Sequence, residues 1–466
     1  MSPKPSPIVI QFESDTVVLR DGDKDTLAKL PGCRWDKRSD CYRAEARWYR
    51  GIIEYLHKNK IRFHDEAKNY ETTSWPMRIS REPFAHQMDA LDRWWNHGAR
   101  GVVVLPTGTG KTHLAVMAIT KASRPTIVVT PTIDLLNQWY DELSMAFDVP
   151  VGLLGGGYYD IQPLTVTTYD SAYIHLERWG DRFGLLIYDE CHHLPSPGYQ
   201  TTAIGSLAPF RLGLTATPER SDGGENALPD LVGPIVFRKD IKELSGNILA
   251  EYHIEKLFVE LSDEEREQYE KAREIYRGFV ESNGISMGGK HGWQRFLQAT
   301  CRSAEGRAAF QAYREQKRLA LAAPGKLHLL EQLLDRHINE RVLIFTYDNA
   351  TVYKIARRFL IPAITHQTKT KEWQKMLQMF HTGEYPFLVT SQVLNEGVNV
   401  PAAGVGIILS GTGSVREHVQ RLGRLLRKHE DKQAVLYEVV TRGTAEEYTS
   451  DRRRKHHAYQ SSESES

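Results

Sequence analysis

Residues 105 to 112 read Leu-Pro-Thr-Gly-Thr-Gly-Lys-Thr and lie between a run of valines, 102–104, and a helix-like stretch, 113–121. A buried strand, a glycine turn and a helix start leave backbone N–H groups and the positive end of a helix dipole pointing at an incoming anion. In such a loop Lys111 reaches the β- and γ-phosphates of a nucleotide, and Thr112 ligates Mg²⁺. The loop therefore predicts nucleotide binding, although Leu105 stands where the strict pattern has glycine. The predicted loop contacts are Leu105, Pro106, Thr107, Gly108, Thr109, Gly110, Lys111 and Thr112.

Short apolar runs rich in β-branched residues alternate with helical stretches along two parts of the chain. The first part contains the runs 102–105, 126–130, 164–168, 185–189 and 211–215. The second contains the runs 342–346, 387–390, 406–409 and 434–440. This alternation is typical of a parallel sheet covered by helices. The predicted fold class is therefore α/β, with two parallel-sheet domains in tandem.

The remaining segments predict a small extra domain and an insertion. Residues 8–70 begin with an alternating strand and end with a helix-like stretch, whereas 262–323 has helical spacing that is interrupted at 286–292. The chain after residue 450 is basic and then rich in Ser and Glu, which favours disorder. The predicted organisation is an N-terminal α+β domain (1–75), a first α/β domain (76–245), a linker with a helical insertion (246–325), a second α/β domain (326–450) and a tail (451–466).

The composition limits the class of protein. With 466 residues the chain is too long for one core and fits about three domains at ~150 residues each. Its 60 Lys and Arg balance 59 Asp and Glu, so the net charge does not indicate a partner. We find no apolar run of the ~18 residues that a membrane span needs and no signal peptide, and we expect no membrane partner. Four cysteines without a C-x-x-C pair favour a reducing, cytoplasmic location.

Two adjacent carboxylates follow the apolar run 185–188. Asp189 and Glu190 are predicted to lie at the carboxyl edge of the sheet, where α/β proteins bind their ligands. There Asp189 can hold Mg²⁺, and Glu190 can orient and deprotonate an attacking water. The following Cys191, His192 and His193 lack further ligands at zinc-type spacing, so we expect no zinc site.

A basic segment in the second repeat adds two candidate catalytic residues. Arg424 and Arg427 are three positions apart and share one face of a predicted helix. Alone, such a face is equally consistent with a solvated surface. Together with a phosphate loop on another domain, the two arginines suit stabilisation of charge on a transferred γ-phosphoryl group.

These motifs, in this order, resemble those of superfamily 2 helicases and translocases over roughly residues 80–445. The resemblance rests on the boxes Asp189-Glu-Cys-His192, Thr215-Ala-Thr217 and Gln420-x-x-Gly-Arg424-x-x-Arg427. It implies two RecA-like domains that use ATP and Mg²⁺. It also implies a set of residues that couple the ATP site to the nucleic acid, namely His192, Thr215, Ala216, Thr217 and Gln420.

The same resemblance assigns ligand contacts outside the phosphate loop. Phe84 and Gln87 resemble an adenine-reading motif, and Gly397 and Asn399 lie in a second-domain motif and are assigned to nucleotide binding. Asn399 stands where many relatives carry Asp. The segments 343–348 and 390–401 resemble motifs on the nucleic-acid face of the second domain. The residues assigned to nucleic-acid contact are Pro131, Thr132, Thr168, Tyr169, Arg220, Asp222 and Thr390.

Within the superfamily, residues 211–222 are most similar to the XPB/Rad25 group of DNA repair and transcription helicases, in a short, prokaryotic-type form. That group carries an Arg-Glu-Asp triplet, of which this chain keeps Arg220 and Asp222 and has Ser221 in the centre. The resemblance implies movement 3′ to 5′ on single-stranded, duplex or forked DNA. It further implies a role in repair such as nucleotide excision repair, a nuclease partner, a damage-sensing N-terminal domain and a helical thumb.

Three alternative functions stay open: an RNA helicase, the duplex translocase of a restriction complex, and a DNA-binding scaffold regulated by ATP. The N-terminal segment bears on this choice. Aromatic residues alternate there with basic ones, which suits stacking on distorted nucleic acid but equally suits a domain core. These aromatic residues are Trp35, Tyr42, Trp48, Tyr49 and Tyr55.

Overall fold

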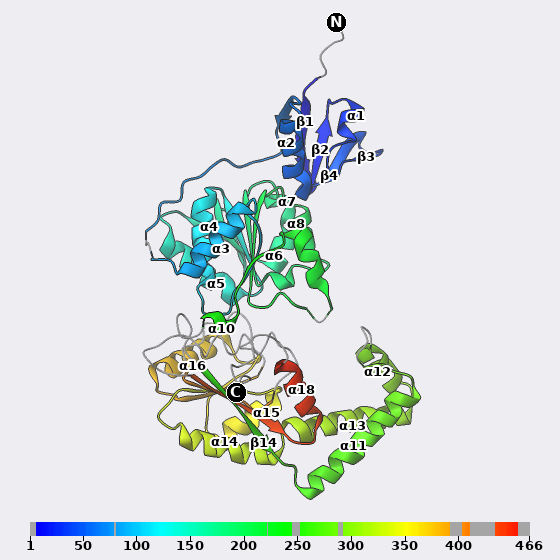
Figure 1. Ribbon diagram of the computed structural model, residues 1–466, viewed down its shortest axis with the longest axis vertical. Helices are drawn as coiled ribbons and strands as arrows, with labels where there is room; N and C mark the ends of the chain where they lie inside the picture. Colours follow the sequence, from blue (N-terminus) through cyan, green and yellow to red (C-terminus); the bar gives the residue numbers. More distant parts are fainter. Residues whose placement is uncertain are drawn as a thin grey trace, which may run out of the picture. The chain divides into compact units, whose positions relative to one another are not determined.

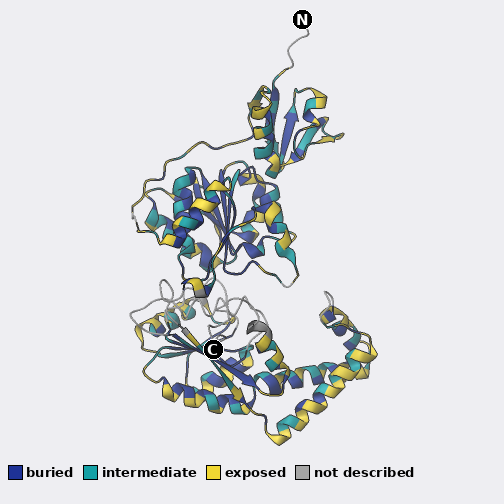
Figure 2. Ribbon diagram, in the orientation of Figure 1, coloured by how far each residue is buried: buried dark blue, intermediate teal, exposed yellow. Residues whose placement is uncertain are grey.

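The computed structural model describes residues 6–78, 81–220, 222–244, 252–287, 292–391, 403–410 and 434–454. The chain divides into two compact units, Met1–Lys239 and Asp240–Ser466, which are described separately. In each unit the central strands are buried and the exposed residues lie on the outer faces of helices (Figures 1 and 2). No helix within the described ranges is long and apolar enough to cross a membrane.

The N-terminal domain is α+β, as predicted, and consists of a five-stranded sheet with one long helix on it. The strand order is β3-β4-β2-β1-β5. Tyr49, Ile52 and Leu56 on the helix are buried against apolar strand residues such as Ile10. The elements are β1 (Ile8–Glu13), β2 (Thr16–Arg20), α1 (Lys24–Leu27), β3 (Arg34–Asp36), β4 (Cys41–Glu45), α2 (Tyr49–Lys58) and β5 (Phe63–Asp65).

This domain packs on the first α/β domain of the same unit. Leu207 of the α/β domain is 1% exposed and belongs to the apolar core of the N-terminal domain. Arg50 on α2 donates hydrogen bonds to the carbonyls of Gly98 (2.5 Å) and Pro209 (3.3 Å). A shared core residue and a charged hydrogen-bond donor both cross this contact, so the two domains pack against each other within one compact unit.

Asp15, in the turn between β1 and β2, makes this contact sensitive to pH. Burial, and then the nearby Glu177 on α7 (Leu176–Trp179), raise the pKa of Asp15 to about 6. Its Oδ1 atom is buried without a hydrogen-bond partner among the described residues. An acid whose pKa is higher in the folded state binds more protons when folded, so stability falls as the pH rises from about 4 to about 6.

We therefore expect Asp15→Asn to stabilise β1 and β2 at neutral pH and to leave them unchanged near pH 4. Native-state hydrogen exchange, corrected for intrinsic exchange rates at each pH, measures this effect. Glu66→Gln is a control at another acidic residue of the domain. Equal protection of wild type and Asp15→Asn at neutral pH would contradict the prediction.

The first α/β domain contains an eight-stranded sheet of order β13-β6-β12-β11-β7-β10-β8-β9, parallel except for the β8–β9 hairpin. All five predicted strands are confirmed. They could be recognised in the sequence because helices cover both faces of the sheet, and strands buried on both faces appear as continuous apolar runs. Strands β8, β9 and β13 were not predicted. The strands are β6 (Arg100–Val104), β7 (Thr126–Thr130), β8 (Val151–Gly155), β9 (Tyr158–Tyr159), β10 (Leu164–Thr168), β11 (Leu185–Asp189), β12 (Phe210–Thr215) and β13 (Ile235–Arg238). The main helices are α3 (Ala85–Asn96), α4 (Lys111–Ala122), α5 (Ile133–Ala146), α6 (Tyr169–Ile174), α8 (Gln200–Ile204) and α9 (Leu228–Leu231).

The second unit is built on a six-stranded parallel sheet of order β14-β19-β18-β15-β17-β16. The four predicted strands are confirmed. The strands are β14 (Tyr252–Val259), β15 (Val342–Phe345), β16 (Ala363–Ile364), β17 (Phe387–Thr390), β18 (Val405–Ile408) and β19 (Ala434–Thr441). The helices around the sheet are α10 (Ile241–Leu244), α14 (Pro324–Arg336), α15 (Asn349–Phe359), α16 (Thr370–Thr382) and α18 (Ala445–Arg454).

One predicted domain boundary is wrong. Residues 252–259 were assigned to a linker, but they form the edge strand β14 and pair in register with β19 from Tyr252 to Val259. The strand carries Glu255 and Lys256 in its middle, as edge strands do. This mixed polar pattern differs from the continuous apolar run expected of a central parallel strand, so β14 could not be recognised from the sequence.

The helical insertion is confirmed as three helices, α11 (Asp263–Ser282), α12 (Gly292–Thr300) and α13 (Ala304–Leu321). Helices α11 and α13 run side by side away from the sheet, with α12 at their far end (Figure 1). Ser262 accepts a hydrogen bond from the Glu265 N–H and Glu265 accepts one from the Ser262 N–H, which fixes the start of α11.

Candidate ATP-binding and hydrolysis site

The phosphate loop joins β6 to α4 and depends on two glycines. Gly108 and Gly110 have φ angles of +86° and +83°, a left-handed backbone that residues with a β-carbon adopt at a cost. Gly110 is also the N-cap of α4, and a β-carbon there would collide with the side-chain amide of Gln87. The N-terminal N–H groups of α4 are therefore left open toward an anion.

Two side chains of the loop hold its backbone. The Thr109 hydroxyl donates to the Pro106 carbonyl at 2.8 Å, and the Lys111 amine donates to the Leu105 carbonyl at 3.1 Å. Thr109 is fully buried, whereas Lys111 and Thr112 are half-buried. The partner of Lys111 is a neutral carbonyl, which a phosphate oxygen can replace with a stronger, charge-assisted bond. Leu105 contributes only its main-chain carbonyl to this contact, so the position does not require glycine.

The structure brings Phe84 and Gln87 to the loop. The Gln87 amide donates to the carbonyls of Gly110 (3.0 Å) and Thr109 (3.4 Å), and its Oε1 accepts from the Phe84 N–H (2.9 Å). Gln87 thus ties α3 to the loop. The Phe84 ring is 51% exposed and stacks on His86 with centroids 5.7 Å apart, so it presents a free aromatic face beside the loop.

Asp189 and Glu190 lie together at the carboxyl end of β11, as predicted, and both are buried. Burial, and then the neighbouring Glu190, raise the pKa of Asp189 to about 6, while Lys111 opposes this rise. Trp139 Nε1 donates to Asp189 Oδ2 at 2.7 Å and fixes the carboxylate. The carboxylate oxygens of this buried pair are the kind of ligand that Mg²⁺ takes, and Lys111 lies close enough to act on the Asp189 charge. The Mg²⁺-binding roles of Asp189 and Thr112 stay predictions.

Three of the predicted coupling residues, His192, Thr215 and Thr217, form a hydrogen-bond network with Glu190. Thr215 Oγ1 lies 3.3 Å from Glu190 Oε2 and 3.1 Å from His192 Nδ1, and it accepts from the Thr217 N–H at 3.2 Å. Arg220 donates to the His192 carbonyl at 2.6 Å. The network therefore runs from Glu190 through the Thr215 hydroxyl and the His192 ring, and Arg220 joins it at the His192 main-chain carbonyl. Ala216, which lies between the two threonines, is also buried.

Arg220 and Asp222, which the sequence analysis assigns to nucleic-acid contact, pair with each other. Two guanidinium nitrogens of Arg220 donate to the Asp222 carboxylate at 2.8 and 2.7 Å. This bidentate contact holds the pKa of Asp222 well below its usual range. The pair is partly exposed and lies where the network reaches the surface.

The predicted nucleic-acid residues of the first domain have different exposures. Thr132 and Thr168 cap α5 and α6, and Pro131 and Thr132 are half-buried. Thr168 is buried.

Tyr169 needs a correction. It is 1% exposed, and its hydroxyl donates to the Asp189 carbonyl at 3.1 Å. Its ring packs inside the sheet edge, so the side chain supports the acidic pair rather than facing DNA.

In the second domain, Thr390 ends β17 and is fully buried, so its assignment to DNA contact is corrected too. Its hydroxyl donates to the Ser391 carbonyl at 3.2 Å, which keeps it inside the sheet end. The predicted residues Gly397, Asn399, Gln420, Arg424 and Arg427 lie outside the described residues. Their roles stay predictions.

An exposed aromatic hairpin escaped the sequence analysis. Tyr158 and Tyr159 form β9 and are 62% and 56% exposed. The Tyr159 ring meets His175 edge to face at 5.1 Å, and exposed Ile133 lies beside the turn at Gly156. The signal in the sequence was the glycine run 155–157 followed by two tyrosines, which indicated a turn but not what the turn displays.

Three parts of the chain match known family models. Residues 80–220 match "Type III restriction enzyme, res subunit", 325–429 match "Helicase conserved C-terminal domain", and 10–67 match "Xeroderma pigmentosum group B helicase damage recognition domain". The chain is 39% identical over 431 residues to "DNA 3′-5′ translocase XPB2" of Sulfurisphaera tokodaii, a match that covers 92% of this chain and 97% of that protein. The chain belongs to the XPB family of helicases.

Other relatives agree with this assignment. "DNA 3′-5′ helicase XPB" of Kineococcus radiotolerans is 32% identical over 79% of this chain and 62% of its own length. The helicase domain of Hef from Pyrococcus furiosus has the same fold, with a TM-score of 0.56, 19% identity, and coverage of 79% of this chain and 98% of that one. The two RecA-like domains predicted from the sequence are thereby confirmed, and the protein is an ATP-dependent helicase by class.

Proposed function

We propose that this protein is an ATP-driven motor that moves 3′ to 5′ along DNA and serves DNA repair. The observation that carries the proposal is the hydrogen-bond network from Glu190 through Thr215 and His192 to Arg220. Such a network lets a change at the γ-phosphate reach a surface arginine without a large rearrangement. The names of the relatives support DNA as the track and 3′ to 5′ as the direction.

The residues of the first domain divide the chemistry among them. Lys111 and the α4 N-terminus bind the phosphates, and Asp189 with Thr112 would hold Mg²⁺, which neutralises phosphate charge when bound. Glu190 accepts the proton of the attacking water. Trp139 and Tyr169 keep Asp189 in place, so the two adjacent carboxylates can act in different roles.

The proposal is tested by ATPase and unwinding assays on the full chain. We expect forked or single-stranded DNA to stimulate hydrolysis more than RNA, and a duplex with a 3′ tail to be unwound in preference to one with a 5′ tail. Lys111→Ala should abolish both activities. Stronger stimulation by RNA would favour an RNA helicase, and DNA remodelling that survives Lys111→Ala would favour a scaffold. A nuclease partner stays a prediction.

The exposed hairpin gives a prediction of its own. The glycine turn that precedes Tyr158 and Tyr159 lies beside the starts of α5 and α6, since a β-carbon on Gly156 would contact Ile133 and one on Gly155 would contact Thr168. The family resemblance locates DNA contacts at these helix starts. Base stacking on an aromatic ring contributes about 1–3 kcal/mol, so replacing both tyrosines by Ala should raise the DNA concentration for half-maximal ATPase stimulation about tenfold or more.

ATP hydrolysis without DNA should not change in this double variant, because neither tyrosine contacts the phosphate loop. Tyr385→Ala, at a partly exposed tyrosine of the other unit, is the matched control. An unchanged DNA requirement in the double variant would exclude the hairpin from the DNA path.

A further inference from the structure

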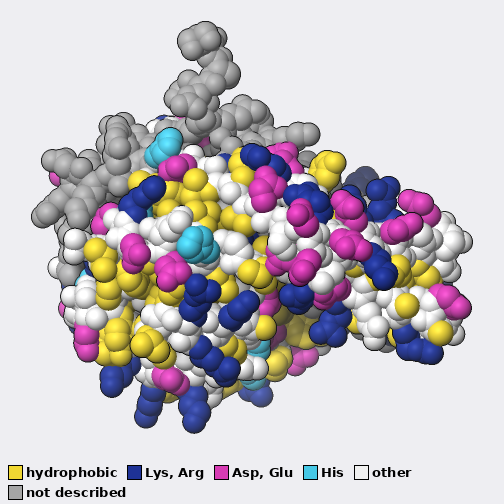
Figure 3. All heavy atoms as spheres, turned by 90° about the horizontal axis from the view of Figure 1, so that it is seen from below, with side chains coloured by type: hydrophobic (Ala, Val, Ile, Leu, Met, Phe, Trp, Pro, Cys, Tyr) yellow, Lys and Arg dark blue, Asp and Glu magenta, His cyan; other side chains and the backbone are white. Residues whose placement is uncertain are grey.

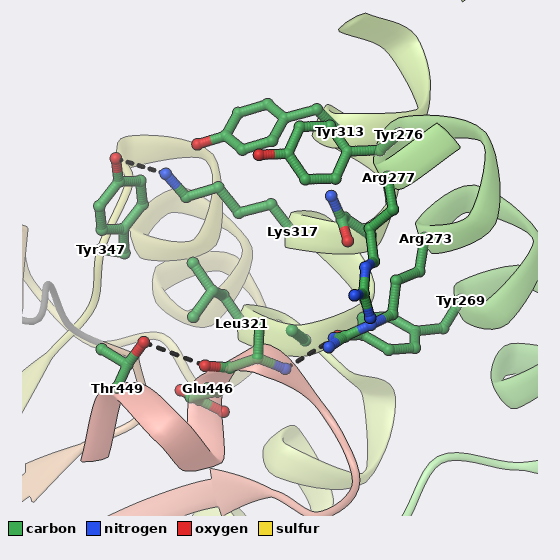
Figure 4. Close-up of a pocket in the computed structure, with 13 residues that line it drawn as sticks. Tyr269, Arg273, Tyr276, Arg277, Tyr313, Lys317, Leu321, Tyr347, Glu446 and Thr449 are labelled. Carbon is green, nitrogen blue, oxygen red and sulfur yellow. Dashed lines mark hydrogen bonds between the residues drawn. The ribbon is translucent and has the colours of Figure 1, made fainter. Parts of the chain in front are cut away.

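A pocket of about 600 Å³ opens where the helical insertion joins the second α/β domain. Its walls come from α11, α13, α18 and Tyr347, which lies two residues after β15; these parts are far apart in the sequence but meet in one unit (Figure 4). This volume is in the range of pockets that hold small organic ligands. Nothing in the motor chemistry described above uses this pocket.

The lining combines aromatic rings with positive charge. Four tyrosines and three basic side chains face it: Tyr269, Tyr276, Tyr313, Tyr347, Arg273, Arg277 and Lys317. Among the described lining residues the acidic side chain is Glu446, and its Oε2 binds the Lys326 amine at 2.6 Å beneath the pocket. On the face shown in Figure 3, basic and acidic side chains are interspersed.

Two of these cations are held in place by tyrosine hydroxyls. The Lys317 amine donates to the Tyr347 hydroxyl at 2.7 Å and lies 4.0 Å from the centroid of that ring. Arg273 donates to the Tyr269 hydroxyl at 2.8 Å, and the same hydroxyl accepts from the Ala445 N–H. In the described part of the chain neither cation has a carboxylate partner, so each keeps charge for a ligand.

Lys317 stays protonated despite its position. Burial lowers the pKa of Lys317, but the phenol groups of Tyr347 and Tyr313 together raise it by more than burial lowers it. The pKa of Lys317 therefore lies above its ordinary value. The Tyr276 and Tyr313 rings are 5.4 Å apart and tilted by 46°, which leaves aromatic faces near the amine. A ligand that fits must therefore be flat, aromatic and anionic, and a nucleotide unit has these properties.

The position of Tyr347 indicates the source of such a ligand. It lies in the segment 343–348, which resembles a motif on the nucleic-acid face of the second domain, and its N–H donates to Ser410 Oγ at 2.9 Å. We propose that the pocket accepts one unstacked nucleotide of a single DNA strand, with the base against the tyrosines and the phosphate at Lys317 and Arg273. This proposal rests on the proposed DNA motor function.

Photo-crosslinking of the full chain tests the contact. A single-stranded oligonucleotide carrying one 5-iododeoxyuridine is bound without ATP, irradiated and digested, and the linked peptides are identified. We expect links to Tyr313 or Tyr347. Links confined to the first unit, in a protein whose ATPase responds to DNA, would overturn the pocket and leave the motor function intact. No response of the ATPase to DNA would instead contradict the motor function.

Variants separate binding from folding. Lys317→Met keeps the aliphatic stem and Tyr347→Phe keeps the ring, and we expect each to weaken single-strand binding, about tenfold for Lys317→Met. Arg314→Gln removes an exposed charge from the same helix, α13, and should change binding less than twofold. Equal affinities of Lys317→Met and Arg314→Gln would overturn the proposal.

Competition distinguishes the strand from a free nucleotide. Thymidine monophosphate in millimolar excess should leave the cross-link to the oligonucleotide in place, because flanking nucleotides add affinity that the monomer lacks. Loss of the cross-link at such concentrations would show a free-nucleotide site and overturn the assignment to a DNA strand.

Discussion

Replacing Glu190 by glutamine is expected to lower DNA-stimulated ATP turnover by about 10²–10⁴-fold while nucleotide binding persists. Glutamine has the same shape and keeps the hydrogen-bonding oxygen that faces Thr215 at 3.3 Å, so the network and the left-handed backbone at this position (φ +46°) survive. The carboxylate that accepts the proton of water is lost. Single-turnover ATP hydrolysis and the binding of a fluorescent nucleotide measure the two properties separately.

Asp141→Asn is the matched control for Glu190→Gln. Asp141 is an exposed carboxylate on α5 of the same domain, and its removal should leave turnover within about twofold of wild type. A Glu190→Gln protein with turnover near that of Asp141→Asn would mean that another group activates the water. Loss of nucleotide binding in Glu190→Gln would indicate a structural role for this residue.

The second large effect is expected at a buried ion pair in the second unit. The side chains of Lys326 on α14 and Glu446 on α18 are 2% and 1% exposed. The Lys326 amine also donates to the carbonyls of Leu409 (2.6 Å) and Val439 (3.2 Å), and Glu446 accepts from the Thr441 N–H. Lys326→Met should destabilise this unit by about 3–5 kcal/mol, because it leaves a buried carboxylate without its cation.

Hydrogen exchange of β18 and β19 in the full chain measures this loss, since a chain with two units does not unfold in a single two-state step. Adding Glu446→Leu to Lys326→Met should recover much of the stability. Glu331→Gln, which breaks the exposed pair with Arg358, should change stability by at most about 1 kcal/mol. A similar small change in Lys326→Met would show that the pair is not important for stability.

The nine strands predicted for the two α/β domains all exist, with ends shifted by at most two residues, because fully buried parallel strands read as continuous apolar runs. Strand β14 was missed because charged residues interrupt its apolar pattern at the edge of the sheet. Strand β9 was missed because a strand of two residues is too short to show a hydrophobic periodicity. The helix start at Lys111 was predictable from its glycines, which determine the local backbone by themselves.

The candidate site was predictable where neighbours in sequence make it, and less so where packing makes it. Asp189 and Glu190 follow a strand, so their place at the sheet edge followed from the sequence. The burial of Tyr169 did not, because its hydroxyl finds the Asp189 carbonyl 20 positions away. The same applies to Tyr158 and Tyr159, whose exposure depends on what surrounds their hairpin.

The sequence by itself determined where the strands of the two α/β domains lie along the chain, the phosphate loop and the acidic pair, since hydrophobic periodicity and glycine conformation are local properties. Only the tertiary structure decided which distant groups meet. Gln87 binds loop carbonyls 22 and 23 positions away, and Lys326 meets Glu446 across 120 positions. Such contacts depend on how helices pack on a sheet, and no local pattern encodes that packing.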